Sequence, residues 1–111
     1  MANRRAEGKE AEDRAANHLV EKGYTIVTRR FKSTRGEIDI VALDGEILVF
    51  VEVKMRRKGE APEWSVDERK VAHLRTAADE YLHKTEQYDR LVRFDMIAID
   101  ADGLRHHEDA F

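Results

Sequence analysis

Two acids and a lysine near the middle of the chain are the residues best suited to chemistry. Asp39 stands in one β-prone run, and Glu52 and Lys54 end the next. Mg²⁺ is usually held by one or two carboxylates together with water and substrate phosphate. A lysine beside such carboxylates can orient an attacking water and stabilise charge that builds on a phosphate. We therefore predict a Mg²⁺ or Mn²⁺ site formed by Asp39, Glu52 and the backbone carbonyl of Val53, with Lys54 assisting.

A predicted hairpin brings these residues together. The runs 37–43 and 46–54 flank Asp44-Gly45, and Asp-Gly between apolar runs is a strong signal for a two-residue turn. With that turn, Glu37 faces Glu52, and Asp39 is the diagonal neighbour of Glu52. Side chains alternate along a strand, so the acids and the lysine are expected on one face of the sheet and Met55 on the other. The residues expected to share the first face are Glu37, Asp39, Glu52 and Lys54.

A sheet face that carries these acids destabilises the fold unless a cation neutralises them, because like charges opposite each other destabilise a hairpin. A divalent cation would remove the penalty. The alternative is a salt-bridge cluster on a solvated strand end, in which Lys54 neutralises Glu52.

The surrounding elements follow from periodicity and end signals. A helix is predicted over residues 4–22, with Glu12, Ala15, Ala16 and Leu19 on one face, and a strand over 24–30. A second helix is predicted over 66–84, with Ser65 as N-cap and Glu68 reaching back to it. A strand over 91–99 comes next, and 104–111 reads as a weak edge strand or a tail. A helix between the third and fourth strands requires a crossover, which predicts a mixed sheet.

This ordered set of motifs resembles the PD-(D/E)XK nucleases. It is most similar to the YraN-like family of small bacterial predicted endonucleases, which is related to archaeal Holliday-junction resolvases. The matching segments are Gly36-Glu37-Ile38-Asp39, Val49-Phe50-Val51-Glu52-Val53-Lys54 and Arg93-Phe94-Asp95, with Gly8, Glu12, Leu19 and Gly23-Tyr24 in the first helix and Lys70 in the second. The resemblance implies an α/β fold with a restriction endonuclease-like α-β-β-β-α-β core, in which helices flank a central mixed sheet. It also implies that residues 1–111 form a single domain.

The resemblance also implies roles for individual residues. Asp39 and Glu52 would bind the metal, Lys54 would assist the attacking water, and Glu12 would bring a carboxylate to the site from the first helix. An alternative for Glu12 is a helix N-terminal acid favoured by the helix dipole. Met55 departs from the small residue that usually follows the lysine, which puts local packing in doubt more than catalysis.

Charge is high and nearly balanced, with 20 basic residues, 23 acidic residues and a net charge of −3. The total argues mildly against a large nucleic-acid surface, but basic residues gather in two short clusters. The alternative is a pair of solvated turns. The residues that we predict to contact nucleic acid are Arg29, Arg30, Lys32, Arg35, Arg56, Arg57, Lys58 and Lys70.

The leading hypothesis is a Mg²⁺-dependent endodeoxyribonuclease that acts on structured or branched DNA. The alternatives are a catalytically silent module of the same fold that binds nucleic acid or a protein partner, and an adaptor whose acids and lysine form an ion-pair network. The sequence has no cysteine and no apolar stretch that predicts a membrane association, which favours the cytoplasm. A homodimer is one option, because related resolvases are dimers. The five histidines show no ligand-like spacing, and His106 and His107 are expected to be exposed.

Overall fold

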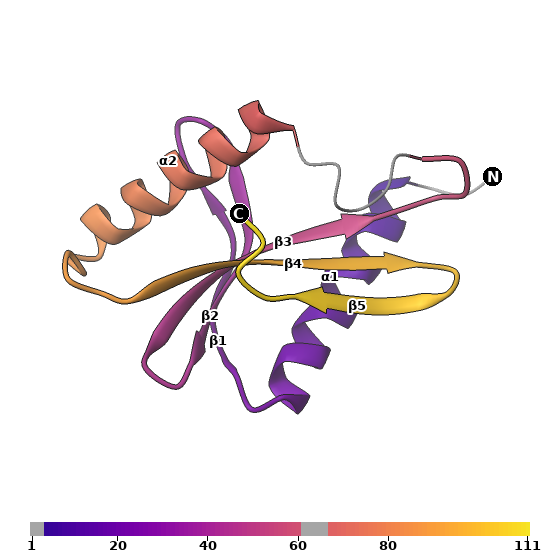
Figure 1. Cartoon of the computed structure of the whole chain (residues 1–111), viewed down its shortest axis with the longest axis horizontal. Coiled ribbons are helices and arrows are strands. Elements are labelled where there is room, and N and C mark those ends of the chain that lie inside the picture. The colour runs from indigo at the N-terminus through magenta and orange to yellow at the C-terminus, as the bar shows by residue number, and fades with distance from the viewer. Residues whose placement is uncertain (1–3, 61–66) are drawn as a thin grey trace.

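The computed structural model describes residues 4–60 and 67–111 (Figure 1). Its elements are α1 (Arg4–Glu21), β1 (Thr25–Lys32), β2 (Glu37–Asp44), β3 (Ile47–Met55), α2 (Glu68–Lys84), β4 (Val92–Asp100) and β5 (Gly103–His107). The predicted order of helix, three strands, helix and strand is confirmed. The segment that reads as an edge strand or a tail supplies the additional strand β5.

The strands form one mixed sheet in the order β1-β2-β3-β4-β5. Among the strands of the described residues, β3 and β4 alone are parallel, and α2 lies in the connection between them. One hydrophobic cluster packs α1 against the sheet, and a second packs α2 against it (Figure 1). The predicted fold class, an α/β restriction endonuclease-like core, is therefore confirmed.

Helix α1 packs closely because its inward face carries small residues. Ala11, Ala15, Ala16 and Leu19 are all buried, and Ala is also the best helix former. The helix ends where Gly23 takes a φ of 94°, a left-handed conformation that glycine adopts without steric cost. The backbone N–H of Tyr24 then donates to the Leu19 carbonyl at 2.9 Å.

The start of α2 differs from the prediction. The N-cap is Asp67, whose carboxylate accepts from the backbone N–H of Arg69 at 2.9 Å. The predicted cap Ser65 and first helical residue Val66 lie outside the described residues. Aspartate is as good an N-cap as serine. Asp67, directly before Glu68, therefore sets the start of α2.

The register of the β2–β3 hairpin also differs from the prediction. Asp44 pairs with Ile47, which makes Gly45-Glu46 the turn. Gly45 has a φ of 60°, and Glu46 is not among the residues with positive φ, as in hairpins with glycine in the first turn position. The prediction of Asp44-Gly45 as the turn is therefore wrong by one position. Extending the observed register places Asp39 directly opposite Glu52.

Candidate functional site

Asp39 lies where strands β2 and β3 stop pairing. The last paired residues at this end are Ile40 and Val51. Asp39 is the next residue of β2 beyond this last pair. Here a side chain takes over from backbone pairing, because Oδ2 of Asp39 accepts a hydrogen bond from the backbone N–H of Val53 at 2.8 Å. The carboxylate therefore sits at the point where the two strands separate.

The strand residues around Asp39 break the usual alternation. Ile38 packs in the cluster beneath α2, whereas Ile40, two residues on, packs in the cluster beneath α1. In the neighbouring strand, Arg30 has a φ of 55°, which is uncommon for a residue with a side chain. A local irregularity thus crosses both strands beside Asp39.

The predicted common face is only partly present. Val53 and Met55 pack in the cluster on the α1 side, so alternation along β3 places Glu52 and Lys54 on the α2 side. A pocket of about 320 Å³ beside α1 is lined by Glu37 and Asp39. The prediction that all four residues project from one face is therefore wrong. Asp39 lines the pocket beside α1, whereas Glu52 contacts Lys70 of α2.

The two carboxyl groups interact strongly. Burial raises the pKa of Asp39 to about 7, and the neighbouring Glu52 carboxylate adds to the shift. Burial also raises the pKa of Glu52, although Lys70 and a hydrogen bond with Asp39 act in the opposite direction. Two carboxylates can share a hydrogen bond only if one of them is protonated, so the pair holds a proton more tightly than isolated acids would.

Glu52 lies near two cations, and the charges of Lys70 and Lys54 both lower its pKa. Its Oε1 lies 3.4 Å from the Nζ of Lys70 at the start of α2. Its Oε2 is buried and has no hydrogen-bond partner among the described residues. A buried charged oxygen without a partner is costly, so this position favours a cation or a hydrogen-bond donor.

Helix α1 brings a third acid to the same place. Glu12 is only 7% exposed and lines the pocket that contains Asp39. Its carboxylate pairs with Arg29 Nη2 at 3.1 Å and with Arg30 Nε at 3.3 Å. The negative charge of Glu12 is one of the causes that raise the pKa of Asp39, so Glu12 belongs to the acidic site.

The predicted nucleic-acid residues do not form one patch. Arg29 and Arg30 are engaged with Glu12. Arg57 pairs with Glu7, and Arg56 lies 3.8 Å from Asp100. The others are spread along the chain. Lys32 ends β1 and Arg35 lies in the β1–β2 connection, both near α2, whereas Lys58 follows β3 and Lys70 contacts Glu52.

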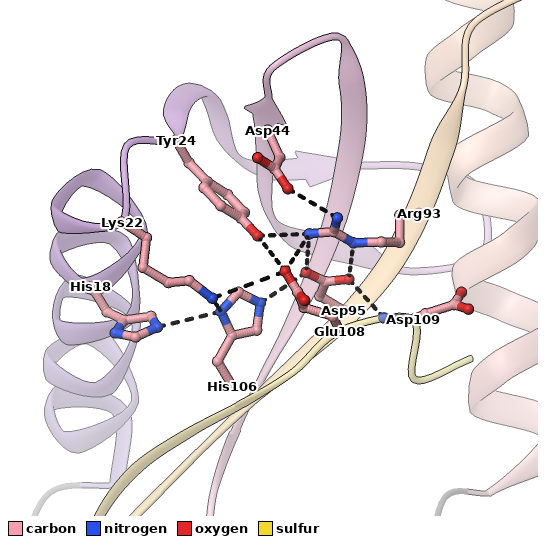
Figure 2. A network of polar contacts seen from close by, with 9 residues as sticks. All are labelled: His18, Lys22, Tyr24, Asp44, Arg93, Asp95, His106, Glu108 and Asp109. Carbon is pink, nitrogen blue, oxygen red and sulfur yellow. Dashed lines mark hydrogen bonds and ion pairs between the residues drawn. The ribbon is translucent and has the colours of Figure 1, made fainter.

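A second polar cluster, which sequence reasoning missed, surrounds Asp95 on β4 (Figure 2). Asp95 is fully buried. Its Oδ1 accepts from Arg93 Nε at 2.8 Å and from the backbone N–H of Asp109 at 3.0 Å. Its Oδ2 lies 2.9 Å from Arg93 Nη2 and 2.8 Å from His106 Nε2. Burial alone would raise the pKa of Asp95, but the hydrogen bonds from His106, Arg93 and Asp109 lower it to about 2.

The contacts around Asp95 connect three segments that are separate in the sequence. Arg93 also reaches Asp44 at 3.0 Å and the hydroxyl of Tyr24 at 2.7 Å. The His106 side chain is only 4% exposed, so the expectation that it is exposed is wrong. An aspartate within the apolar strand Phe94-Asp95-Met96-Ile97 was the signal that could have revealed a buried network, because such a charge requires partners.

Comparison with known proteins assigns the chain to a family. A family model described as "Uncharacterised protein family UPF0102" matches residues 11–99. The chain belongs to the UPF0102 family. The matched range contains Glu12, Asp39, Glu52, Lys54 and Asp95, and the YraN-like resemblance is confirmed at the level of the family.

UPF0102 proteins from distant bacteria resemble the chain over nearly its whole length. A UPF0102 protein of Persephonella marina is 43% identical over 108 residues, covering 94% of this chain and 91% of its own. One from Pseudothermotoga lettingae is 39% identical over 101 residues, covering 91% and 94%. One from Rhodococcus opacus is 38% identical over 118 residues, and both chains are covered completely. Within the described part of the chain, neither helix is long and apolar enough to cross a membrane.

Proposed function

We propose that this UPF0102 protein is a metal-dependent nuclease of the PD-(D/E)XK type that hydrolyses phosphodiester bonds in DNA, with structured or branched DNA as the favoured substrate. The observation that carries the proposal is the coupled pair of buried carboxyl groups at the end of the β2–β3 ladder. Burial raises the pKa of both carboxyl groups, and the Glu52 charge adds to the shift of Asp39, so a nearby positive charge would stabilise the ionised pair. Lys70 contacts Oε1 of Glu52.

The donor set fits a hard divalent cation. Mg²⁺ and Mn²⁺ favour carboxylate, carbonyl and water oxygens. Glu52 interacts with the Asp39 carboxyl and has one buried oxygen without a hydrogen-bond partner among the described residues. Asp39 and Glu52 would hold the ion, with the Val53 carbonyl as a further predicted ligand. When bound there, the cation would activate water and stabilise charge on the phosphate.

The chain's own residues would complete the chemistry. Lys54 lies two positions beyond Glu52 on the same side of β3, where its ammonium can orient the attacking water and stabilise negative charge on the phosphate. Glu12, held by Arg29 and Arg30, adds a carboxylate on the α1 side. Lys70 neutralises Glu52 and can exchange this contact for a phosphate oxygen when substrate is bound.

A catalytically silent module that binds nucleic acid or a protein partner is the alternative. It is favoured by the net charge of −3 and by the ion pairs that already occupy Arg29, Arg56 and Arg57. A silent module has no reason to retain affinity for a divalent cation, so metal binding separates the two functions.

Metal binding is expected to raise the melting temperature. Mn²⁺ at one hundred times its dissociation constant should stabilise the fold by about 2.7 kcal/mol, which is roughly 10 °C for a domain of this size. Glu52→Gln should lose this response, whereas the control Asp13→Asn, at an exposed acid, should keep it. Equal Mn²⁺ responses in wild type and Glu52→Gln would contradict the proposed site.

Replacing Lys54 should separate binding from chemistry. Lys54→Met keeps both carboxylates, so its Mn²⁺-dependent stabilisation should match that of wild type, while cleavage should fall by roughly a hundredfold or more. The measurement is a cleavage assay on linear, flap, fork and four-way-junction DNA with Mg²⁺ or Mn²⁺. Absence of cleavage by the wild type on every substrate would favour the silent module.

A further inference from the structure

The last turn of α1 and the end of β5 bring two histidines together, and an acid follows one of them along the chain (Figure 2). His18 Nε2 lies 3.3 Å from His106 Nδ1. Lys22 Nζ lies 3.1 Å from the same His106 nitrogen and 4.0 Å from Glu108 Oε1. We propose that His18, His106 and Glu108 form a second metal site, one that takes a transition metal of the Zn²⁺ type and is separate from the Asp39–Glu52 site.

The neighbours of His106 fix its tautomer. On one side, Nε2 contacts the Asp95 carboxylate at 2.8 Å, and an ionised carboxylate only accepts hydrogen bonds. On the other side, Nδ1 contacts the ammonium of Lys22, which only donates. The proton of a neutral His106 therefore lies on Nε2. Nδ1 presents a lone pair toward His18 and Lys22, as a metal ligand must.

A cation already occupies the space in front of that lone pair. The ammonium of Lys22 contacts His106 Nδ1 and lies within ion-pair distance of Glu108, so the local field attracts positive charge. Lys22 reaches the cluster from an exposed position, and its long side chain can return to solvent. A metal ion would thus replace one cation by another at a position that favours cations.

The spacing of the two imidazoles suits a tetrahedral metal. Zn–N bonds of ~2.0–2.1 Å at a tetrahedral angle place two ligand nitrogens ~3.3–3.4 Å apart, and the observed separation is 3.3 Å. The rings meet edge to face at an interplanar angle of 76°, so neither covers the other's nitrogen.

Glu108 supplies the third ligand rather than Asp95. The ligand atoms of Asp95, His106 and Glu108 all lie within 4.8 Å of one another, but both Asp95 oxygens are occupied by four hydrogen bonds, two of them from the Arg93 guanidinium. Asp95 instead acts as the outer carboxylate that orients the ligating histidine, a common arrangement around zinc. Glu108 is half exposed, and its Oε1 accepts from the Tyr24 hydroxyl at 2.9 Å and lies 3.3 Å from Arg93 Nη2. Its side chain would exchange these contacts for the metal.

The ligand set selects a metal class different from that of the acidic site. Two imidazole nitrogens and one carboxylate suit Zn²⁺, Co²⁺ or Ni²⁺, whereas Mg²⁺ prefers oxygen ligands. The second site therefore does not depend on the proposed nuclease function. Its metal would join α1 to the C-terminal strand, next to the Asp95 network.

Cobalt titration of the full chain tests the site, with an Asp39→Asn background to remove the acidic site. One equivalent of Co²⁺ should produce the visible absorption of a tetrahedral complex, and Zn²⁺ should abolish it by displacement. His18→Ala should weaken Co²⁺ binding at least about tenfold. Lys22→Met should tighten it several-fold, because the competing ammonium is gone.

Two outcomes would overturn the second site. One is Co²⁺ binding to His18→Ala with the affinity of the Asp39→Asn parent, and the other is the absence of visible absorption in the parent itself. A thermal melt of each variant without metal establishes that it is folded, since His18 and Lys22 lie at the surface end of α1. Neither outcome bears on cleavage by the acidic site, so the two proposals fail separately.

Discussion

Replacing Asp39 with asparagine is expected to abolish metal-dependent cleavage and, at the same time, to make the metal-free protein more stable at alkaline pH. The loss of cleavage should be roughly a thousandfold or more, because the substitution removes one of the two carboxylates proposed to hold the cation. Asparagine keeps the shape of the side chain, and its amide oxygen can still accept from the backbone N–H of Val53. The fold is therefore expected to persist.

The gain in stability follows from the raised pKa of Asp39. In the unfolded chain this carboxyl loses its proton near its ordinary value of 3.8, whereas in the folded state burial and Glu52 raise the pKa to about 7. The folded state thus binds more protons over this interval, so wild-type stability falls as pH rises through it. Asparagine carries no charge, and at about pH 8 the variant should exceed wild type by on the order of 2 kcal/mol.

Urea unfolding in the presence of a chelator measures this difference. The advantage of Asp39→Asn over wild type should grow between about pH 5 and about pH 8, and Mn²⁺ should reverse it by stabilising wild type alone. The opposite result would be a metal-free wild type that becomes more stable, relative to the variant, as pH rises. That result would show that Asp39 is not a buried acid with a raised pKa.

Asp95→Ala is expected to be the most destabilising single substitution among the polar residues described above. It leaves the guanidinium of Arg93 and the imidazole of His106 without their central acceptor. Breaking a buried ion pair by removing one partner typically costs about 3–5 kcal/mol, which is a large share of the total stability of a small domain. The same change frees the backbone N–H of Asp109.

Chemical unfolding near neutral pH checks this, with Asp13→Ala as a control. Asp13 also pairs with an arginine, but both side chains are well exposed, so its loss should change stability little. Because the pKa of Asp95 is lowered to about 2, its stabilisation is present above its ordinary pKa of 3.8 and is lost as pH falls toward 2. An Asp95→Ala variant as stable as Asp13→Ala would refute the assigned role of the network.

The elements of this fold could be predicted from local sequence. The Ala-rich face of α1, the glycine after it and the apolar run of β3 each follow from short-range propensities, and the order of elements follows from them. The hairpin was located correctly, yet its register was missed by one residue. Asp44-Gly45 and Gly45-Glu46 both form acceptable turns, and the choice depends on pairing along the whole of β2 and β3.

The residues of the candidate site could be identified from sequence more easily than their positions in the fold. Alternation predicts that Asp39 and Glu52 share a face, but the irregularity marked by Arg30, with a φ of 55°, and by Ile38 breaks alternation beside Asp39. Such local distortions depend on tertiary packing, so a strand pattern does not reveal them. His106 was misjudged for a similar reason, because it packs against His18 of α1, which is distant in the chain.

The parallel pairing of β3 with β4 has a consequence for how the acidic site assembles. Leu48 pairs with Val92, and the whole of α2 intervenes between them, whereas β1, β2 and β3 are joined by short connections. Contacts between distant segments form late, since the loop must close first. We therefore expect the β1–β3 meander to form first during folding, and β3, with Glu52 and Lys54, to gain its rigid second neighbour only when β4 docks. Amide exchange should accordingly be slowest where β3 is paired on both sides, at Leu48–Val51.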